Sequence, residues 1–190
     1  MRTVSRMRAF LLLYHALDSP EEPATVDSAA DLSLAVGAGD FRQQLRCLSE
    51  LGMEIVSLQN LLAAKPGGHD GSHDGRQGVG PFDDGHRGNW AMALPSLLQA
   101  GAVATFYVVA GLVDRHPDFM TTAQLRELAS HRMLIGSHGM THRFLPQLSA
   151  ADVRRELLDS RGRLEDLLGQ SVTDLAIPGG HLNRRILETA

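Results

Sequence analysis

The chain has 190 residues, of which 43% are hydrophobic and 21% charged, and its formal net charge is −4. This composition is ordinary for a globular protein with a hydrophobic core, and the length predicts a single domain over residues 1–190. The Lys and Arg residues are scattered and form no basic stripe, so we expect no nucleic-acid partner.

The only cysteine is Cys47, which excludes an intramolecular disulfide. Cys47 lies within a helical pattern, and we expect it to be a small core residue. No apolar run is long enough to span a membrane. The N-terminal segment resembles a signal peptide only faintly, because its apolar run Phe10–Tyr14 is short and is interrupted by His15. Cytoplasmic localisation is therefore favoured. Nothing in the sequence indicates an oligomeric state.

Apolar runs of strand length alternate with helical periods along the chain. In chain order we expect a strand at Ala9–Tyr14, a helix at Phe41–Leu51, a strand at Glu54–Ser57, an exposed Gly-, His- and Asp-rich loop at residues 65–80, a strand at Val103–Val109, a helix at Thr122–Ser130, a strand at Met133–Ser137, a helix at Ser149–Leu168, a strand at Asp174–Ile177 and a helix at Arg184–Thr189.

The expected helices carry their own signals. Phe41, Leu45 and Leu48 share one face of the first helix. Ser149 can cap the long third helix, and Gly169 can end it. The buried stripe of that helix is expected at Val153, Leu157, Leu164 and Leu168.

Alternating strands and helices predict an α/β fold whose parallel strands are joined by right-handed crossovers. We expect a distorted or incomplete (β/α) barrel, in which functional residues lie at the C-terminal ends of the strands. The sequence ends at Ala190 inside the last expected helix, so the barrel is expected to be shortened at its C-terminus.

Two histidines follow the strand expected at Met133–Ser137. His138 and His142 are four residues apart, which in a helical turn leaves the imidazoles about 40° apart around the axis. Two neutral imidazoles on one face can bind a divalent ion. Taken alone, the spacing is more typical of two surface histidines, and the position after a strand is what favours a metal site.

An acidic pair, Asp83 and Asp84, follows Phe82 and precedes Gly85. Taken alone, it could be a solvated turn. Together with the histidines it suggests more, because one carboxylate and two imidazoles form a metal site with open positions. The second carboxylate can take a proton from water, and these parts suit the hydrolysis of an amide or an ester.

These stretches resemble the polysaccharide deacetylase family. Pro81–Gly85 is similar to the family's T-F-D-D-G motif, and His138–His142 matches the spacing of its H-[ST]-x-x-H motif. The segments Ala104–Val108 and Ile135–His138 are also similar to family sequence. The likeness runs from about Phe10 to the end of the chain.

The resemblance implies roles for the motif residues. Asp83 would be the general base. Asp84, His138 and His142 would hold a divalent metal, with zinc expected first and cobalt, manganese, nickel or iron as alternatives. The substrate would be an N-acetylated carbohydrate.

The resemblance also extends to the end of the chain and to its first strand. Ala176–Gly180 lies where the family has R-x-P-Y-G, so Pro178 and Gly179 would line the site and the Gly179 N–H would be a candidate oxyanion donor. Leu12–His15 is similar to the subgroup that acts on exopolysaccharide (poly-N-acetylglucosamine). In that subgroup the general acid lies near the N-terminus, which makes His15 the candidate acid.

Several residues depart from the family pattern. Pro81 and the glycines Gly78 and Gly80 predict a strand that is short, distorted or at a sheet edge. Ala176 stands where the family has an arginine beside the base, and Arg184 or Arg185 could replace it. Aromatic residues are only 5% of the chain, and His181 is expected to be exposed.

Three functional hypotheses remain open. The first is a metal-dependent hydrolase that removes N-acetyl groups from a polysaccharide or an oligosaccharide. The second is a C–N hydrolase of a small non-sugar amide, which the low aromatic content favours. The third is a non-catalytic, metal- or carbohydrate-binding relic of the family, which Pro81 and Ala176 favour.

Overall fold

A computed structural model describes residues 9–18, 34–63 and 77–190. All pairings between its named strands are parallel. The strands are Phe10–Leu11 (β1), Ala16–Asp18 (β2), Ala35–Gly37 (β3), Glu54–Ile55 (β4), Gln77–Val79 (β5), Thr105–Val108 (β6) and Leu134–Ser137 (β7).

The strands form three small sheets, ordered β1-β5-β4, β2-β3 and β6-β7. Single parallel bridges join the first of these sheets to the β6-β7 sheet, because Phe82, which follows β5, pairs with Tyr14 on one side and with Phe106 of β6 on the other. A further bridge links Ser137 to Leu175. Parallel pairing therefore runs without a break from the first strand to Leu175, and neighbouring strands end at a common edge.

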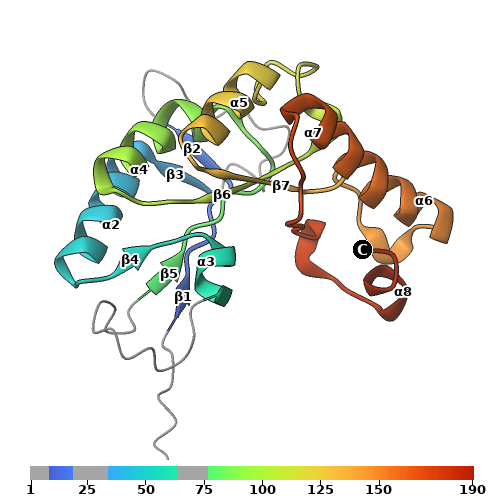
Figure 1. Cartoon of the computed structure of the whole chain (residues 1–190), viewed down its shortest axis with the longest axis horizontal. Helices are drawn as coiled ribbons and strands as arrows, with labels where there is room; N and C mark the ends of the chain where they lie inside the picture. Colours follow the sequence, from blue (N-terminus) through green and yellow to red (C-terminus); the bar gives the residue numbers. More distant parts are fainter. Residues whose placement is uncertain (1–8, 19–33, 64–76) are drawn as a thin grey trace, which may run out of the picture.

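Helices follow one another around the outer side of these strands (Figure 1). The α-helices are Ala38–Glu50 (α2), Leu58–Ala63 (α3), Leu94–Ala100 (α4), Thr122–Ser130 (α5), Ala150–Arg154 (α6), Ser160–Leu168 (α7) and Arg184–Leu187 (α8). π-Helical turns occupy Asn89–Ala93 (η1) and Arg155–Asp159 (η4), and 3-10 turns occupy Ala110–Leu112 (η2), Leu145–Gln147 (η3) and Pro178–Gly180 (η5).

The main core contains a row of aromatic rings under the acidic pair. Phe82 stacks on Tyr14 and on Phe106 with ring centroids 5.1 and 4.8 Å apart, and Phe41 of α2 meets it edge-on at 5.6 Å. Such offset and edge-on contacts add to the burial energy of the rings. The row fixes the backbone at Phe82, directly before Asp83.

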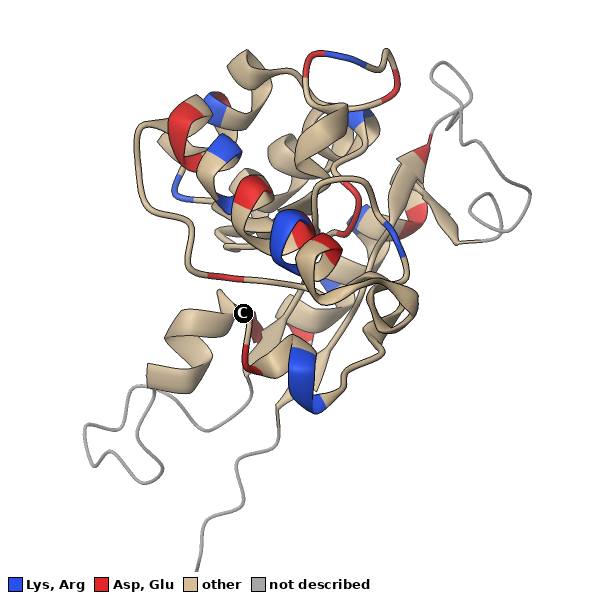
Figure 2. Cartoon of the chain, turned by 90° about the vertical axis from the view of Figure 1, so that its right-hand side faces the viewer, with Lys and Arg blue, Asp and Glu red and all other residues tan. Residues whose placement is uncertain are grey.

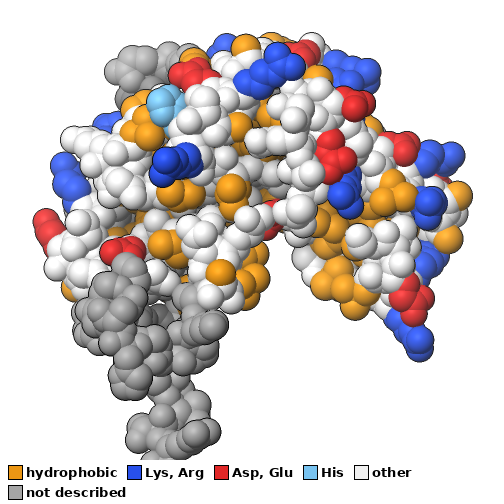
Figure 3. Space-filling view, viewed as in Figure 1, with side chains coloured by type: hydrophobic (Ala, Val, Ile, Leu, Met, Phe, Trp, Pro, Cys, Tyr) orange, Lys and Arg blue, Asp and Glu red, His pale blue; other side chains and the backbone are white. Residues whose placement is uncertain are grey.

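A second, smaller hydrophobic cluster holds the C-terminal helices together. Its buried members are Leu145, Leu148, Val153, Leu157 and Ile186. Figure 3 shows further hydrophobic side chains on the surface over α6 and α8, where Leu182 and Leu187 are exposed.

Most of the expected elements are present. The helix expected at Thr122–Ser130 begins and ends at those residues, and Thr121 caps it through a capping box with Gln124. Ser149 caps α6 by accepting the Asp152 N–H, and Gly169 ends α7 in the left-handed conformation. The helix expected to run from Ser149 to Leu168 is interrupted by η4, which periodicity does not signal.

Three expectations were wrong. Residues 77–79 were assigned to a loop but form β5, which lies between β1 and β4 and not at an edge, although it is short as expected. Cys47 is exposed on the outer face of α2 and is not a core residue. The strand expected at Asp174–Ile177 is reduced to the single bridge at Leu175.

The α/β class with parallel strands is confirmed, whereas closure of a barrel is not. Among the described residues, the pairing ends at Leu175 and does not return to the first strand.

No helix in the described ranges is long and apolar enough to cross a membrane. Acidic and basic residues are interspersed along α6 and α7, as Figure 2 shows. The expected loop at 65–76, including His69 and His73, lies outside the described residues.

Candidate metal centre

The acidic pair follows β5 and comes directly after the bridge residue Phe82. Asp83 donates its N–H to the Tyr14 carbonyl at 2.8 Å, and the Asp84 carbonyl accepts the Val109 N–H at 3.2 Å. The backbone turns sharply here, because Asp84 and Gly85 have φ of 70° and 84°. Aspartate tolerates this left-handed conformation better than most residues. The turn places both carboxylates on the same edge of the sheet.

The two histidines lie on a loop after β7. The His138 N–H donates to the Val108 carbonyl at 2.9 Å, and Gly139 and His142 have φ of 84° and 58°. The expected helical turn is therefore wrong. The imidazoles converge because the loop reverses through two left-handed residues, not because they are four apart on a helix face.

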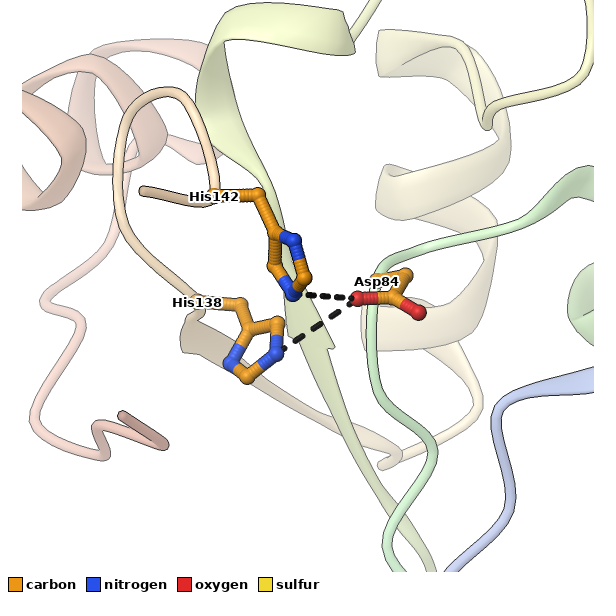
Figure 4. A group of neighbouring side chains, drawn as sticks. All are labelled: Asp84, His138 and His142. Atoms are coloured by element: carbon orange, nitrogen blue, oxygen red, sulfur yellow. Dashed lines mark ion pairs between the residues drawn. The ribbon is translucent and has the colours of Figure 1, made fainter. Parts of the chain in front are cut away.

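Both imidazoles point at one carboxylate oxygen (Figure 4). Asp84 Oδ1 lies 3.2 Å from His142 Nε2 and 3.5 Å from His138 Nε2. Asp83 lies beside them, with its Oδ2 3.8 Å from His138 Nε2. Asp83, Asp84 and His138 are buried, whereas the His142 side chain is about half exposed. The centre thus opens to solvent on the His142 side.

The site holds its carboxylates in two different states. Burial, then repulsion by Asp84, raises the pKa of Asp83 to about 7. Burial also pushes the pKa of Asp84 upward, but the contact with His142 and the charges of the neighbouring imidazoles outweigh it, so its pKa lies below the usual value. Asp84 is therefore the anion of the pair, and Asp83 is the group that exchanges a proton near neutrality.

The protonation of His138 suits a metal ligand. Burial lowers its pKa, which favours the neutral imidazole. Its Nδ1 lies 3.0 Å from the Ala176 carbonyl, which can only accept, so Nδ1 carries the hydrogen. The lone pair of Nε2 is thereby directed at Asp84. A backbone carbonyl commonly orients a metal-binding histidine in this way.

These residues fit a divalent metal ion. Asp84, His138 and His142 each offer one ligand atom, and the three atoms lie within 4.8 Å of one another. Asp84 Oδ1 is buried and accepts no hydrogen bond among the described residues. Ligand atoms at about 2.0 Å from a tetrahedral ion lie roughly 3.3 Å apart, close to the two nitrogen–oxygen distances of the site.

The other expected site residues lie around this centre. His15 follows Tyr14, whose carbonyl holds the Asp83 N–H, and its charge acts on the pKa of His138. Its backbone carbonyl accepts from Asn89 Nδ2 at 2.7 Å. Pro178 is buried and packs close to Gly139, since a Cβ added to Gly139 would lie 3.8 Å from the proline ring. Gly179 has φ of 70°, which suits glycine.

Neither candidate for the missing arginine reaches Asp83. Arg184 forms an exposed ion pair with Glu188, and Arg185 donates to the Leu148 carbonyl. Asp83 Oδ1 is buried without a hydrogen-bond partner among the described residues. Burial and the charge of Asp84 raise the pKa of Asp83, and among the described residues neither Arg184 nor Arg185 is close enough to oppose this.

Sequence reasoning gave no role to His86, which completes the surroundings of Asp84. Its Nε2 lies 3.9 Å from Asp84 Oδ2, on the other oxygen of the same carboxylate, and its ring stacks on Phe119 at 4.6 Å. The signal was its position directly after Asp-Asp-Gly. His181 is exposed, as expected.

Comparison with known proteins identifies the family. The profile of the polysaccharide deacetylase family matches residues 76–190, more than half of the chain. The chain belongs to the polysaccharide deacetylase family. It is also 25% identical over 180 residues to YxkH of Bacillus subtilis (strain 168), a protein whose name places it among the polysaccharide deacetylases. That match covers 95% of this chain and 60% of YxkH, so the chain spans less than two thirds of this relative.

Two solved structures share this fold. The Streptococcus pyogenes deacetylase PplD, solved in complex with acetate, superposes with a TM-score of 0.79 and 27% identity, covering 95% of this chain and 77% of PplD. IcaB from Ammonifex degensii superposes with a TM-score of 0.75 and 23% identity, covering 95% of this chain and 78% of IcaB. The likeness to IcaB concerns the fold.

Proposed function

We propose that this polysaccharide deacetylase homologue is a metal-dependent hydrolase that removes N-acetyl groups from a polysaccharide or an oligosaccharide. The observation that carries the proposal is the convergence of His138 and His142 on Asp84, with a second buried carboxylate, Asp83, beside them. Three ligands on one side leave room for water and a carbonyl on the other. Zinc suits two imidazoles and one carboxylate, and cobalt, manganese, nickel or iron are alternatives.

The reaction needs a base, an acid and a group that stabilises the oxyanion. When bound, a divalent ion would polarise the acetamide carbonyl and lower the pKa of water. Asp83 takes the proton from the attacking water, for which a pKa of about 7 is suitable near neutral pH. His15, at the end of the first strand, gives a proton to the leaving amine. The Gly179 N–H, with Pro178 beside it, lines the position of the developing oxyanion.

One observation supports the removal of an acetyl group, and a second favours a sugar over a small non-sugar amide. PplD, at 27% identity, is a deacetylase solved with acetate, the acid that N-deacetylation releases. Two residues after His142, Phe144 is 39% exposed and meets the His181 ring edge-on at 5.0 Å. Both rings also pack close to Gly179, since a Cβ added to this glycine would lie within 3.9 Å of each ring. An exposed aromatic surface at the rim of the site can pack against the apolar face of a sugar ring.

The decisive experiment measures acetate released from an N-acetylglucosamine oligomer by the zinc-loaded protein. We expect His138→Ala to abolish both zinc binding and turnover, because it removes a ligand. Asp83→Asn should keep zinc and lower kcat by at least about 100-fold, the scale of general-base catalysis. His131→Ala, on the exposed end of α5, is the matched control and should match the unsubstituted protein.

Other outcomes would favour the alternatives. Zinc binding without release of acetate from any sugar or small amide would indicate a non-catalytic relic, consistent with the positions of Arg184 and Arg185 away from Asp83. Turnover of small amides alone would indicate the non-sugar hydrolase. Full activity of Asp83→Asn would contradict the assignment of the base.

A further inference from the structure

The loop between the two histidine ligands is held by a buried acid outside the motifs. Glu156, the second residue of η4, is only 5% exposed. One carboxylate oxygen, Oε2, accepts the N–H groups of Met140 and Thr141 at 2.9 and 2.8 Å. The other, Oε1, accepts the Thr141 hydroxyl. Glu156 therefore binds the middle of the segment whose ends are His138 and His142.

Removing this acceptor would be costly, because the N–H groups of Met140 and Thr141 would lose their hydrogen-bond partner. Among the described residues, Glu156 forms no salt bridge, and its hydrogen-bond partners are all donors of this loop. Because all of these hydrogen bonds go to Met140 and Thr141, the structural effect of the Glu156 carboxylate is concentrated on this loop. Its place in a π-helical turn agrees, since such turns are frequent at functional sites.

The opposite side of the loop is held as well. The carbonyls of Gly139 and Met140 accept the N–H groups of Ala110 and Gly111 at 3.0 and 2.9 Å. Glu156 binds the N–H groups of the same segment, so the loop is fixed from both sides. Gly139 permits this approach, because a Cβ there would lie 3.2 Å from Glu156 Oε2 in a backbone with φ of 84°.

We propose that Glu156 is a positioning residue that sets the separation of His138 and His142 and thereby the metal affinity of the centre. The loop is not a helix, so no regular hydrogen-bond ladder fixes the two imidazoles. The carboxylate supplies that constraint. The inference rests on the proposed metal-dependent function, but it concerns metal binding and not turnover.

The reach of the side chain, more than its charge, should matter. Glu156→Gln keeps an acceptor oxygen at the same distance, and the Thr141 hydroxyl can turn to accept from the new amide. Glu156→Asp keeps the charge but shortens the side chain by one methylene, so it cannot reach both N–H groups. Glu156→Ala leaves the loop donors buried without a partner.

The test titrates the metal-free protein with Co²⁺ and follows its visible absorption and affinity. We expect Glu156→Ala and Glu156→Asp to weaken Co²⁺ binding about 10- to 100-fold, the usual effect of losing a partner behind a ligand. Glu156→Gln should stay within about threefold of the unsubstituted protein. Glu165→Ala is the matched control. Glu165 lies on α7 and also accepts the N–H of a loop residue, Val172, but this loop does not carry the metal ligands.

Each outcome decides the inference. Unchanged Co²⁺ affinity in folded Glu156→Ala, or an equal loss in Glu165→Ala, overturns it. If Glu156→Ala does not fold, the comparison of Glu156→Asp with Glu156→Gln decides, and equal affinities overturn the inference. Normal Co²⁺ binding without deacetylation contradicts the proposed function and leaves the inference intact. No Co²⁺ binding by the unsubstituted protein overturns both.

Discussion

At the scale of single residues, the centre depends on two adjacent carboxylates with opposite shifts in pKa. Asp84 faces two imidazoles and stays ionised, whereas burial and repulsion by Asp84 raise the pKa of Asp83. Because the pKa of Asp83 is raised to about 7 from an ordinary 3.8, ionising it costs the folded state free energy. In the metal-free protein, the ionised form of Asp83 is therefore destabilised at the site where a cation would bind.

This cost predicts a pH dependence of stability. A raised carboxyl pKa contributes stability that is complete below the unfolded pKa of 3.8 and is lost as the pH rises toward 7. Asp83→Asn cannot ionise, so it should gain stability over the unsubstituted protein between pH 4 and 7 and keep the gain above it. The shift corresponds to a gain of at most roughly 4 kcal/mol.

Urea unfolding in the presence of a chelator, at pH values from 4 to 8, measures the difference. A difference between the two proteins that does not change with pH would show that Asp83 titrates normally. Asp152→Asn is a suitable control, because Asp152 is a partly exposed carboxylate whose pKa is lowered by Ser149 and Arg155, so this substitution should give the opposite sign.

At the scale of elements, the structure shows why a glycine-rich segment can be an inner strand. Gly78 of β5 pairs with Phe10 of β1, and a Cβ on Gly78 would lie 2.0 to 2.4 Å from atoms of the Phe10 ring. The ring occupies the space that a side chain would take. Glycine weakens an isolated strand, but here it allows the close approach that joins β1 to β5.

We therefore expect Gly78→Ala to destabilise the fold by about 1 to 3 kcal/mol, the usual cost of overpacking. Gly162→Ala is the control, since Gly162 lies inside α7 with no atom within 4 Å of an added Cβ, and it should stabilise by roughly 0.5 to 1 kcal/mol. Thermal unfolding measures both. In the double variant Phe10→Ala/Gly78→Ala, the two penalties should fail to add, because the first change removes the clash. Additive penalties would count against this explanation.

The same example shows what local sequence could predict. The stripes on α2 and on α6–α7, the Thr121 and Ser149 caps and the Gly169 end depend on neighbouring residues, so the sequence predicted them. The role of β5 depends on a ring 68 positions earlier in the chain, and η4 depends on packing between elements. Local sequence patterns therefore cannot predict the inner position of β5 or the π-helical turn η4.

The candidate site shows a similar division. Its residue types and motifs identified Asp83, Asp84, His138 and His142, and the structure brings all four together. The reason given for the histidine pair was wrong, because spacing alone could not reveal the left-handed loop. Glu156 was visible only as one more charged residue in a helix, since its partners lie 15 and 16 residues earlier in another element.

At the scale of the whole molecule, the centre joins parts that are far apart in sequence. Asp84 comes from the segment that follows β5 and the bridge at Phe82, whereas His138 and His142 come from the loop after β7. The parallel bridges align these ends at one edge. A metal ion held by all three would therefore bind the folded chain and not the unfolded one, and would link binding to stability.

This linkage predicts that zinc raises the midpoint of thermal unfolding. At a free zinc concentration 100 times Kd, the added stability is about 2.7 kcal/mol. The effect should fade below pH 6, because protons compete for the imidazoles. His138→Ala should lose the effect. The variant His69→Ala/His73→Ala, which removes the other closely spaced histidines of the chain, should keep it. Loss of stabilisation in that variant, with retention in His138→Ala, would place the bound zinc outside the proposed centre.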